Sequence, residues 1–258
     1  MSTDDVKPLL KKWALVTGSS SGIGRAIALE LAAAGANVIV HGCSQQTAAE
    51  SLAEQIRARD NSAESICCDL LDDSQLADLV RRAWQVAPLD IWINNAGADV
   101  LTGQAAQGSF EQKLELLWCV DVQATIQLSR DVGARMKQRG NGVILNIGWD
   151  QADHGMAGDS GEMFAAAKGA VMAFTRSLAK SLAPQVRVNC IAPGWIRTAW
   201  GERASEAWQQ RATNESLLER WGTPEDVARV ARFLVSPAAE FINAQTIQVN
   251  GGRATPFA

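Results

Sequence analysis

Short apolar segments alternate with amphipathic segments along this chain, and this alternation constrains its fold more than any other feature. Residues 13–17, Trp-Ala-Leu-Val-Thr, are a typical apolar segment, and Gly18 ends it. Such a short run bounded by a turn residue is typical of a buried strand. Further segments of this kind cover residues 37–41, 65–68, 91–94, 143–147, 186–191 and 246–249.

Between these segments, hydrophobic residues recur at helical spacing. The expected helices cover residues 22–34, 47–59, 74–86, 110–138, 162–182 and 224–234. Gly35 follows the first helix as a terminating glycine, and Thr223-Pro224 caps the last one. Since the strands are apolar throughout, both faces of their sheet must be covered. The sequence therefore predicts a doubly wound α/β Rossmann fold, a parallel sheet of about seven strands with helices on both faces.

Composition narrows the class of protein further. The net charge of −4 offers no basic surface for nucleic acid. No apolar run approaches the roughly 20 residues of a membrane helix, and the polar start lacks a signal-peptide pattern. We expect a cytoplasmic protein without nucleic-acid or membrane partners, and a single dinucleotide-binding domain over residues 1–258. The irregular residues 195–222 predict a mobile lid, with a solvated pair of helices as the alternative.

Cysteines and histidines do not form a metal-binding pattern. The chain has five cysteines and two histidines, and they lack the spacing of metal ligands. We interpret the cysteines as reduced and mostly buried. No metal site is expected.

A glycine-rich loop joins the first expected strand to the first expected helix. It reads Thr-Gly-Ser-Ser-Ser-Gly-Ile-Gly over residues 17–24. Glycines let the backbone approach a diphosphate closely, and the helix start supplies N–H groups and partial positive charge. The loop residues that we expect to bind a dinucleotide are Gly18, Ser20, Ser21, Gly22, Ile23 and Gly24.

The loop and several later motifs resemble the short-chain dehydrogenase/reductase family, especially its ketoacyl-reductase-like members. The resemblance spans nearly the whole chain and includes Asp-Leu at 69–70, Asn-Asn-Ala-Gly at 94–97 and Pro-Gly-x-x-x-Thr at 193–198. It implies an NAD(P)(H)-dependent oxidoreductase acting on a small carbonyl, alcohol or related substrate. The further coenzyme-binding residues that it implies are Asp69, Leu70, Asn95, Ala96, Gly97, Lys168, Pro193, Gly194, Ile196 and Thr198.

The resemblance also implies a homodimer or homotetramer, formed through the helices at 110–138 and 162–182. Small residues around position 168 would permit the close approach of a partner helix. The alternative is that they pack against the chain's own sheet.

The residue that ends the second strand selects between the two nicotinamide coenzymes. Gly42 occupies the place of the acidic residue in NAD-using relatives, so nothing there rejects a 2′-phosphate. Cys43 stands where NADP users often carry arginine, but His41 and Ser44 could hold the phosphate. We favour NADP(H) and leave NAD(H) open. The alternative is that His41 and Cys43 only pack beside the adenine.

The catalytic positions implied by the resemblance carry unusual residues. The family's Tyr-x-x-x-Lys motif aligns with Phe164 and Lys168, its serine with Trp149, and its asparagine with Asp121. The chain contains no tyrosine, so no phenol elsewhere in it can replace the missing one.

Two interpretations of this site stay open. In the first, another group donates the proton, and His154 is the best candidate because an imidazole is a common general acid. A solvated loop histidine is the plainer interpretation of this residue. Lys168 could also serve, or could simply form an ion pair with Asp121. In the second, the chain is a catalytically impaired pseudoenzyme that acts as a redox sensor or partner subunit. We rank an oxidoreductase first, because Lys168, Pro193 and Thr198 are retained.

Overall fold

Seven parallel strands form one sheet in the order β3-β2-β1-β4-β5-β6-β7. The computed structural model describes residues 7–43 and 46–253. Its strands are β1 (Trp13–Val16), β2 (Asn37–Gly42), β3 (Ala63–Cys67), β4 (Ile91–Asn94), β5 (Gly142–Ile147), β6 (Val186–Pro193) and β7 (Thr246–Val249). The strand order reverses at β1, which pairs with both β2 and β4. The predicted fold class is confirmed.

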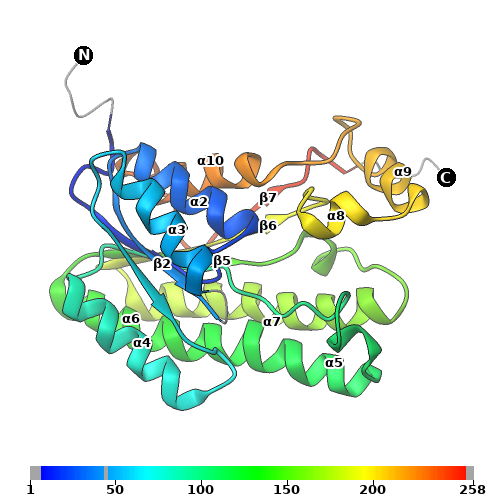
Figure 1. Cartoon of the computed structure of the whole chain (residues 1–258), viewed down its shortest axis with the longest axis horizontal. Helices are drawn as coiled ribbons and strands as arrows, with labels where there is room; N and C mark the ends of the chain where they lie inside the picture. Colours follow the sequence, from blue (N-terminus) through cyan, green and yellow to red (C-terminus); the bar gives the residue numbers. More distant parts are fainter. Residues whose placement is uncertain (1–6, 44–45, 254–258) are drawn as a thin grey trace.

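Helices cover both faces of this sheet, as Figure 1 shows. One face carries α2 (Gly22–Ala33), α3 (Gln46–Arg57) and α10 (Pro224–Val235), and the other carries α4 (Asp73–Val86), α6 (Ala124–Arg139) and α7 (Asp159–Leu182). Three shorter helices, α5 (Phe110–Leu117), α8 (Ala199–Arg203) and α9 (Glu206–Asn214), lie at the carboxyl end of the sheet. None of the helices in the described ranges has the length and apolar character that crossing a membrane requires.

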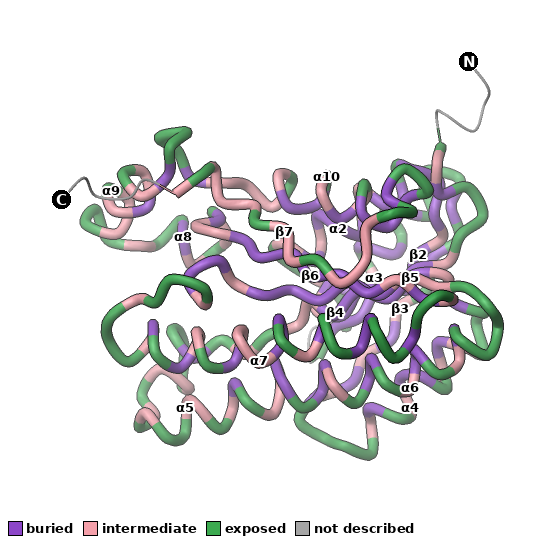
Figure 2. Tube along the Cα trace, turned by 180° about the vertical axis from the view of Figure 1, so that it is seen from behind, coloured by how far each residue is buried: buried purple, intermediate pink, exposed green. Residues whose placement is uncertain are grey.

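The apolar strands separate two hydrophobic layers. Val38 and Val40 of β2 face the layer under α2, α3 and α10, whereas Ile39 between them faces the layer under α4, α6 and α7. Figure 2 shows the sheet as a buried band between the two helical layers. Burial on both faces is the reason why the strands read as continuous apolar runs.

The expected helix over residues 110–138 is wrong in one respect, because a π-helical turn at Trp118–Gln123 separates α5 from α6. Asp121 lies in this turn and is buried. Its carboxylate accepts a hydrogen bond from the backbone N–H of Ala98, at 2.8 Å. Wider turns of this kind often occur at functional sites. Helical periodicity alone does not reveal such a turn, because the apolar spacing continues through it.

A chain of buried polar side chains connects the two central strands to the helices beneath them. Asn94 on β4 donates to Ser129 Oγ at 2.7 Å and to Asn146 Oδ1 on β5 at 2.8 Å. Asn146 donates in turn to Thr175 Oγ1 on α7, at 2.8 Å. Because buried polar groups cost free energy unless they are paired, these bonds fix the position of α7 against the carboxyl ends of the strands.

Replacement of Thr175 by valine tests this chain. Thr175→Val keeps the side-chain shape but leaves the buried Asn146 Nδ2 without its acceptor, so the free energy of unfolding should fall by about 1–3 kcal/mol. Thr213→Val is the matched control, because Thr213 makes the same bond to the carbonyl four residues earlier without a buried amide as partner. It should cost less than about 0.5 kcal/mol. Urea unfolding of the two variants gives the comparison, and equal costs would contradict this role of Thr175.

Candidate functional site

A cleft of about 700 Å³ opens at the carboxyl ends of the strands around β1. This is where the strand order reverses, and open α/β sheets bind their ligands at such a point. Most of the residues predicted to bind a coenzyme line it: Gly18, Ser20, Ser21, Gly22, Ile23, His41, Asp69, Leu70, Asn95, Ala96, Gly97 and Thr198. Ser44 lies outside the described residues.

The glycine-rich loop is tied directly to the end of β4. Thr17 Oγ1 accepts hydrogen bonds from the backbone N–H groups of Asn95 and Ala96, at 2.9 and 3.0 Å. The Asn95 side chain donates back to the carbonyls of Thr17 and Gly18. Gly18 has a φ of +60°, and a Cβ there would lie 2.8 Å from the Ala96 Cα. Only glycine therefore permits this approach of the two segments.

The start of α2 is open toward the cleft. Ser21 is its N-cap residue but makes no side-chain bond to the first turn, and that turn contains no acidic residue. Its N–H groups and the positive end of the helix dipole are thus available to an anion such as a diphosphate. Gly24 does not line the cleft. A Cβ on Gly24 would lie 2.4 Å from Asn95 Nδ2, so this glycine serves the packing of the loop.

His41 supports the glycine-rich loop from the end of β2. The side chain is buried, and its Nδ1 accepts a hydrogen bond from the Gly18 backbone N–H at 3.0 Å. Its Nε2 lies 3.2 Å from Cys68 Sγ. Burial lowers the pKa of His41 to about 4, so the ring is neutral near pH 7. A neutral acceptor of this kind shapes the glycine loop and does not attract a phosphate, so this geometry favours the packing alternative.

Lys168 and Asp121 form a buried ion pair next to the cleft. Lys168 Nζ lies 2.7 Å from Asp121 Oδ2, and the two side chains are 13% and 2% exposed. The ammonium also donates to the Ile147 carbonyl, at 3.3 Å. A Cβ on Gly97, which lines the cleft, would lie 2.9 Å from Asp121 Oδ2. The pair therefore stands directly behind the cleft wall.

Two aromatic rings accompany this pair. Phe164 precedes Lys168 by one turn of α7 and hence shares its helix face. The Trp149 ring, in the loop after β5, meets the Phe164 ring edge-on with centroids 6.1 Å apart. The structure thus brings together four of the five residues that were predicted to be catalytic.

The remaining predicted residues are more distant from the cleft. His154 is exposed in the loop between β5 and α7. Pro193, Gly194 and Ile196 continue the end of β6 without lining the cleft, and the Gly194 N–H donates to the Val249 carbonyl at 3.0 Å.

The burial of Asp150, which follows Trp149, was not predicted from the sequence. Asp150 is 3% exposed, and its Oδ1 has no hydrogen-bond partner among the described residues. Its Oδ2 accepts from Asn250 Nδ2 at 3.1 Å, and burial raises the pKa of this carboxyl group. Nothing in the sequence distinguished it from its solvated acidic neighbours, because its burial depends on the packing of the chain after β7.

The segment over residues 195–222 contains a tryptophan cluster. Neighbouring rings of the cluster have centroids 5.3–6.3 Å apart. Its members are Trp195, Trp200, Trp208 and Trp221. The Arg211 guanidinium lies over two of the rings, and Glu215 accepts a 2.7 Å bond from Trp195 Nε1. This packing argues against the solvated pair of helices. The density of tryptophans in the segment was the signal that could have indicated it.

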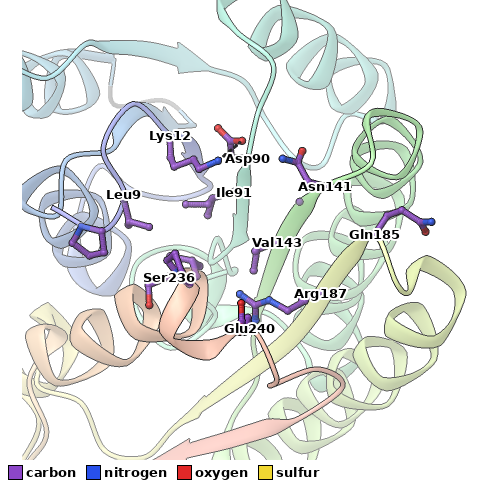
Figure 3. A pocket seen from close by; sticks show the side chains of 14 residues that line it. Leu9, Lys12, Asp90, Ile91, Asn141, Val143, Gln185, Arg187, Ser236 and Glu240 are labelled. Atoms are coloured by element: carbon purple, nitrogen blue, oxygen red, sulfur yellow. Dashed lines mark hydrogen bonds and ion pairs between the residues drawn. The ribbon is translucent and has the colours of Figure 1, made fainter. Parts of the chain in front are cut away.

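A second cavity, of about 300 Å³, lies at the amino ends of β4, β5 and β6 (Figure 3). Lys12, Asp90 and Arg187 in its lining are engaged in contacts within the protein. Lys12 pairs with Asp90 at 3.4 Å, and Arg187 donates to the carbonyls of Leu234 and Ile242. These contacts hold the protein's own segments together. The candidate active site is therefore the cleft at the opposite end of the sheet.

Comparison with known proteins agrees with this geometry. The profile of a family described as Enoyl-(Acyl carrier protein) reductase matches residues 18–254. A short-chain type dehydrogenase/reductase of Picea abies is 35% identical over 249 residues, which make up 93% of this chain and 91% of the relative. A 3-oxoacyl-(acyl-carrier-protein) reductase of Aquifex aeolicus is also 35% identical, over 93% of this chain and 96% of its own length.

This chain belongs to the short-chain dehydrogenase/reductase family. The family prediction made from the glycine-rich loop and the later motifs is thereby confirmed, and the chain is an NAD(P)-dependent oxidoreductase of this family. Its fold matches a 7 alpha-hydroxysteroid dehydrogenase complexed with NADH and 7-oxo glycochenodeoxycholic acid, with a TM-score of 0.88 at 30% identity over 98% of both chains. It also matches a 3-oxoacyl (acyl-carrier-protein) reductase from Agrobacterium tumefaciens C58 with NADP bound, with a TM-score of 0.87 at 30% identity and the same coverage.

The neutral His41 makes the stability of this short-chain dehydrogenase/reductase depend on pH. The unfolded chain binds a proton at this histidine near pH 6.5, whereas the folded chain resists it until about pH 4. Stability from this group is therefore complete above about pH 6.5 and is lost as the pH falls, by about 2 kcal/mol between pH 7 and pH 5. His41→Asn keeps an acceptor for Gly18 but cannot titrate. Urea unfolding at both pH values should show this loss in the wild type and not in the variant; equal losses would contradict it.

Proposed function

We propose that this enzyme transfers a hydride between NAD(P)(H) and a small carbonyl, alcohol or related substrate in a non-standard active site. The observation that carries this proposal is the buried Lys168–Asp121 pair, which borders the coenzyme-sized cleft. The bound coenzyme would supply the hydride chemistry. The protein's own contribution is to hold the coenzyme, position the substrate and exclude water.

The residues around the cleft fit such a coenzyme. The loop from Gly18 to Ile23 and the first turn of α2 are suited to the diphosphate, because they offer N–H groups and no acidic side chain. Asp69 and Leu70 would border the adenine, and the segment from Asn95 to Gly97 would support a ribose. At the other end, Thr198 lines the cleft beside Trp200 and would hold the nicotinamide carboxamide.

We infer a preference for NADP(H) from the end of β2. Gly42 is the last residue of that strand, so no carboxylate stands where it would repel a 2′-phosphate. Several structural neighbours of similar fold hold NADP, and another holds NADH. No lysine or arginine lies among the described residues of the cleft lining, and we therefore expect the preference to be modest.

Gly42→Asp tests this coenzyme choice. The added carboxylate should bond the adenosine ribose of NAD(H) and repel the phosphate of NADP(H), so that NADP(H) binding weakens about tenfold or more. Gly42→Asn is the control, because it has a similar size and no charge. Tryptophan-fluorescence titration of each protein with both coenzymes gives the dissociation constants. A wild-type protein that binds NAD tenfold more tightly than NADP would contradict the preference.

The active site is non-standard in that Phe164 and Trp149 stand at the positions where the family resemblance places tyrosine and serine. The chain contains no tyrosine, and neither aromatic ring can release a proton near neutral pH. This absence favours one alternative function, a catalytically impaired coenzyme-binding protein that acts as a redox sensor or partner subunit.

The double variant Phe164→Tyr, Trp149→Ser separates the two functions. General acid catalysis typically contributes about 10²–10⁴-fold, so the double variant should reduce ketones at least about 100-fold faster than the wild type. Phe164→Leu with Trp149→Ser is the control, because it opens the same space without a phenol. NADPH consumption against ketones, quinones and activated alkenes gives the rates. Coenzyme binding without turnover of any of these substrates by the wild-type protein would favour the sensor.

We propose further that the protein assembles as a homodimer or homotetramer through α5, α6 and α7. Trp118 between α5 and α6 is 42% exposed, and a Cβ on Gly169 of α7 would contact nothing within 4 Å. An exposed aromatic ring beside a helix face with open space suits a partner helix. Sedimentation at micromolar concentration tests this, and a clean monomer would contradict it.

A further inference from the structure

Reduction of a carbonyl group needs a proton as well as a hydride, and the described residues that line the cleft include no tyrosine or lysine that could donate it. Lys168 is not part of this lining, and its ammonium directs two of its three N–H groups to Asp121 Oδ2 and the Ile147 carbonyl. The Phe164 ring, one turn earlier on α7, packs edge-on against the Trp149 ring. His41 is buried against the glycine loop, His154 is exposed to solvent, and the buried Asp150 carboxyl group lies outside the lining, where it bonds Asn250. A ketone held here would take its proton from water. Its reduction would then lack the rate enhancement that a positioned general acid provides.

The charge of the cleft lining has the same sign as that of an anionic substrate. The carboxylates in its lining are Asp69 and Asp99, and its described lining includes no lysine or arginine. Lys168 behind the wall is balanced by Asp121. A carboxylate or phosphate substrate would find no counter-ion in this lining, whereas a cation would be attracted.

The substrate end of the cleft offers aromatic faces to such a cation. Trp200 lines the cleft and stacks on Trp195, with ring centroids 6.3 Å apart. The same cluster already holds one cation, because the Arg211 guanidinium lies 5.8 Å from the centroid of Trp195 and 4.8 Å from that of Trp208. Cations are stabilised over indole rings at these distances.

We propose that the substrate of this site is an iminium ion, a cation with a carbon–nitrogen double bond, attached to a flat aromatic or aliphatic ring system. This inference deepens the proposed function and rests on it. The hydride from NAD(P)H forms a new bond to the iminium carbon, and the electron pair of the carbon–nitrogen π bond becomes the lone pair of a neutral amine. The positive charge passes to the oxidised coenzyme. No proton is taken up or released, so the step needs no acid from the protein.

A binding experiment tests the cationic site without turnover. The probes are 2,2-dimethyl-1,2,3,4-tetrahydroisoquinolinium, which cannot be reduced, and its uncharged isostere 2,2-dimethyltetralin. Tryptophan fluorescence of the coenzyme-saturated protein should show that the cation binds at least about tenfold more tightly. Trp200→Leu should remove most of that difference. Trp84→Leu is the control and should retain it, because Trp84 lies on α4, outside the cleft lining. Equal binding of the two probes would overturn the proposal.

A turnover experiment completes the test. NADPH oxidation above the rate without protein is measured with N-methyl-3,4-dihydroisoquinolinium, with 2-tetralone and with a quinone. The iminium ion should give a kcat/KM at least about 100-fold above that of the ketone. Faster reduction of the ketone or the quinone, or of none of the three while NADPH binds, would overturn the iminium assignment. Failure of the protein to bind either coenzyme would instead contradict the proposed function itself.

Discussion

The contact on which the candidate active site depends is the buried ion pair between Lys168 and Asp121. It joins α7 to the π-helical turn between α5 and α6, and through the Ala98 N–H it reaches the wall of the cleft. A buried pair contributes little net stability, because desolvation offsets its attraction, but removal of one partner leaves an uncompensated charge. The pair therefore acts mainly as a constraint on position. It holds the ammonium behind the cleft, on the helix face that α7 shares with Phe164.

The coenzyme end of the cleft is rigid for a different reason. Thr17, Gly18, Asn95 and Ala96 connect the ends of β1 and β4 by hydrogen bonds and by close contact, while the neutral His41 supports the loop from β2. The N–H groups of α2 are thus oriented before any ligand arrives. Such preorganisation lowers the cost of binding a dinucleotide, and it allows the substrate end to vary in sequence without loss of the coenzyme site.

Much of the fold followed from periodicity, because a strand buried on both faces must be apolar and its helices must show one apolar face. The strand positions were predicted on that basis, whereas the coenzyme-binding loop after the first strand was predicted from its glycines and from the family resemblance. The π-helical turn at Trp118–Gln123 was not predicted, since a single wider turn leaves the apolar spacing intact. The burial of Asp150 and the tryptophan contacts of the segment after β6 were also missed, because both depend on neighbours that are distant in sequence. The neutral state of His41 was missed for the same reason, because its burial depends on residues that are distant in sequence.

The most direct measurement of the central claim is a crystal structure of the protein with NADP(H) bound. The diphosphate should lie on the N–H groups at the start of α2, and the nicotinamide should lie between Lys168 and Thr198, with Trp149 and Phe164 beside its reactive face. That arrangement would show that the cleft is a coenzyme site whose substrate end lacks a proton donor. A coenzyme bound elsewhere, or an ionisable side chain in place beside the nicotinamide ring, would contradict the account.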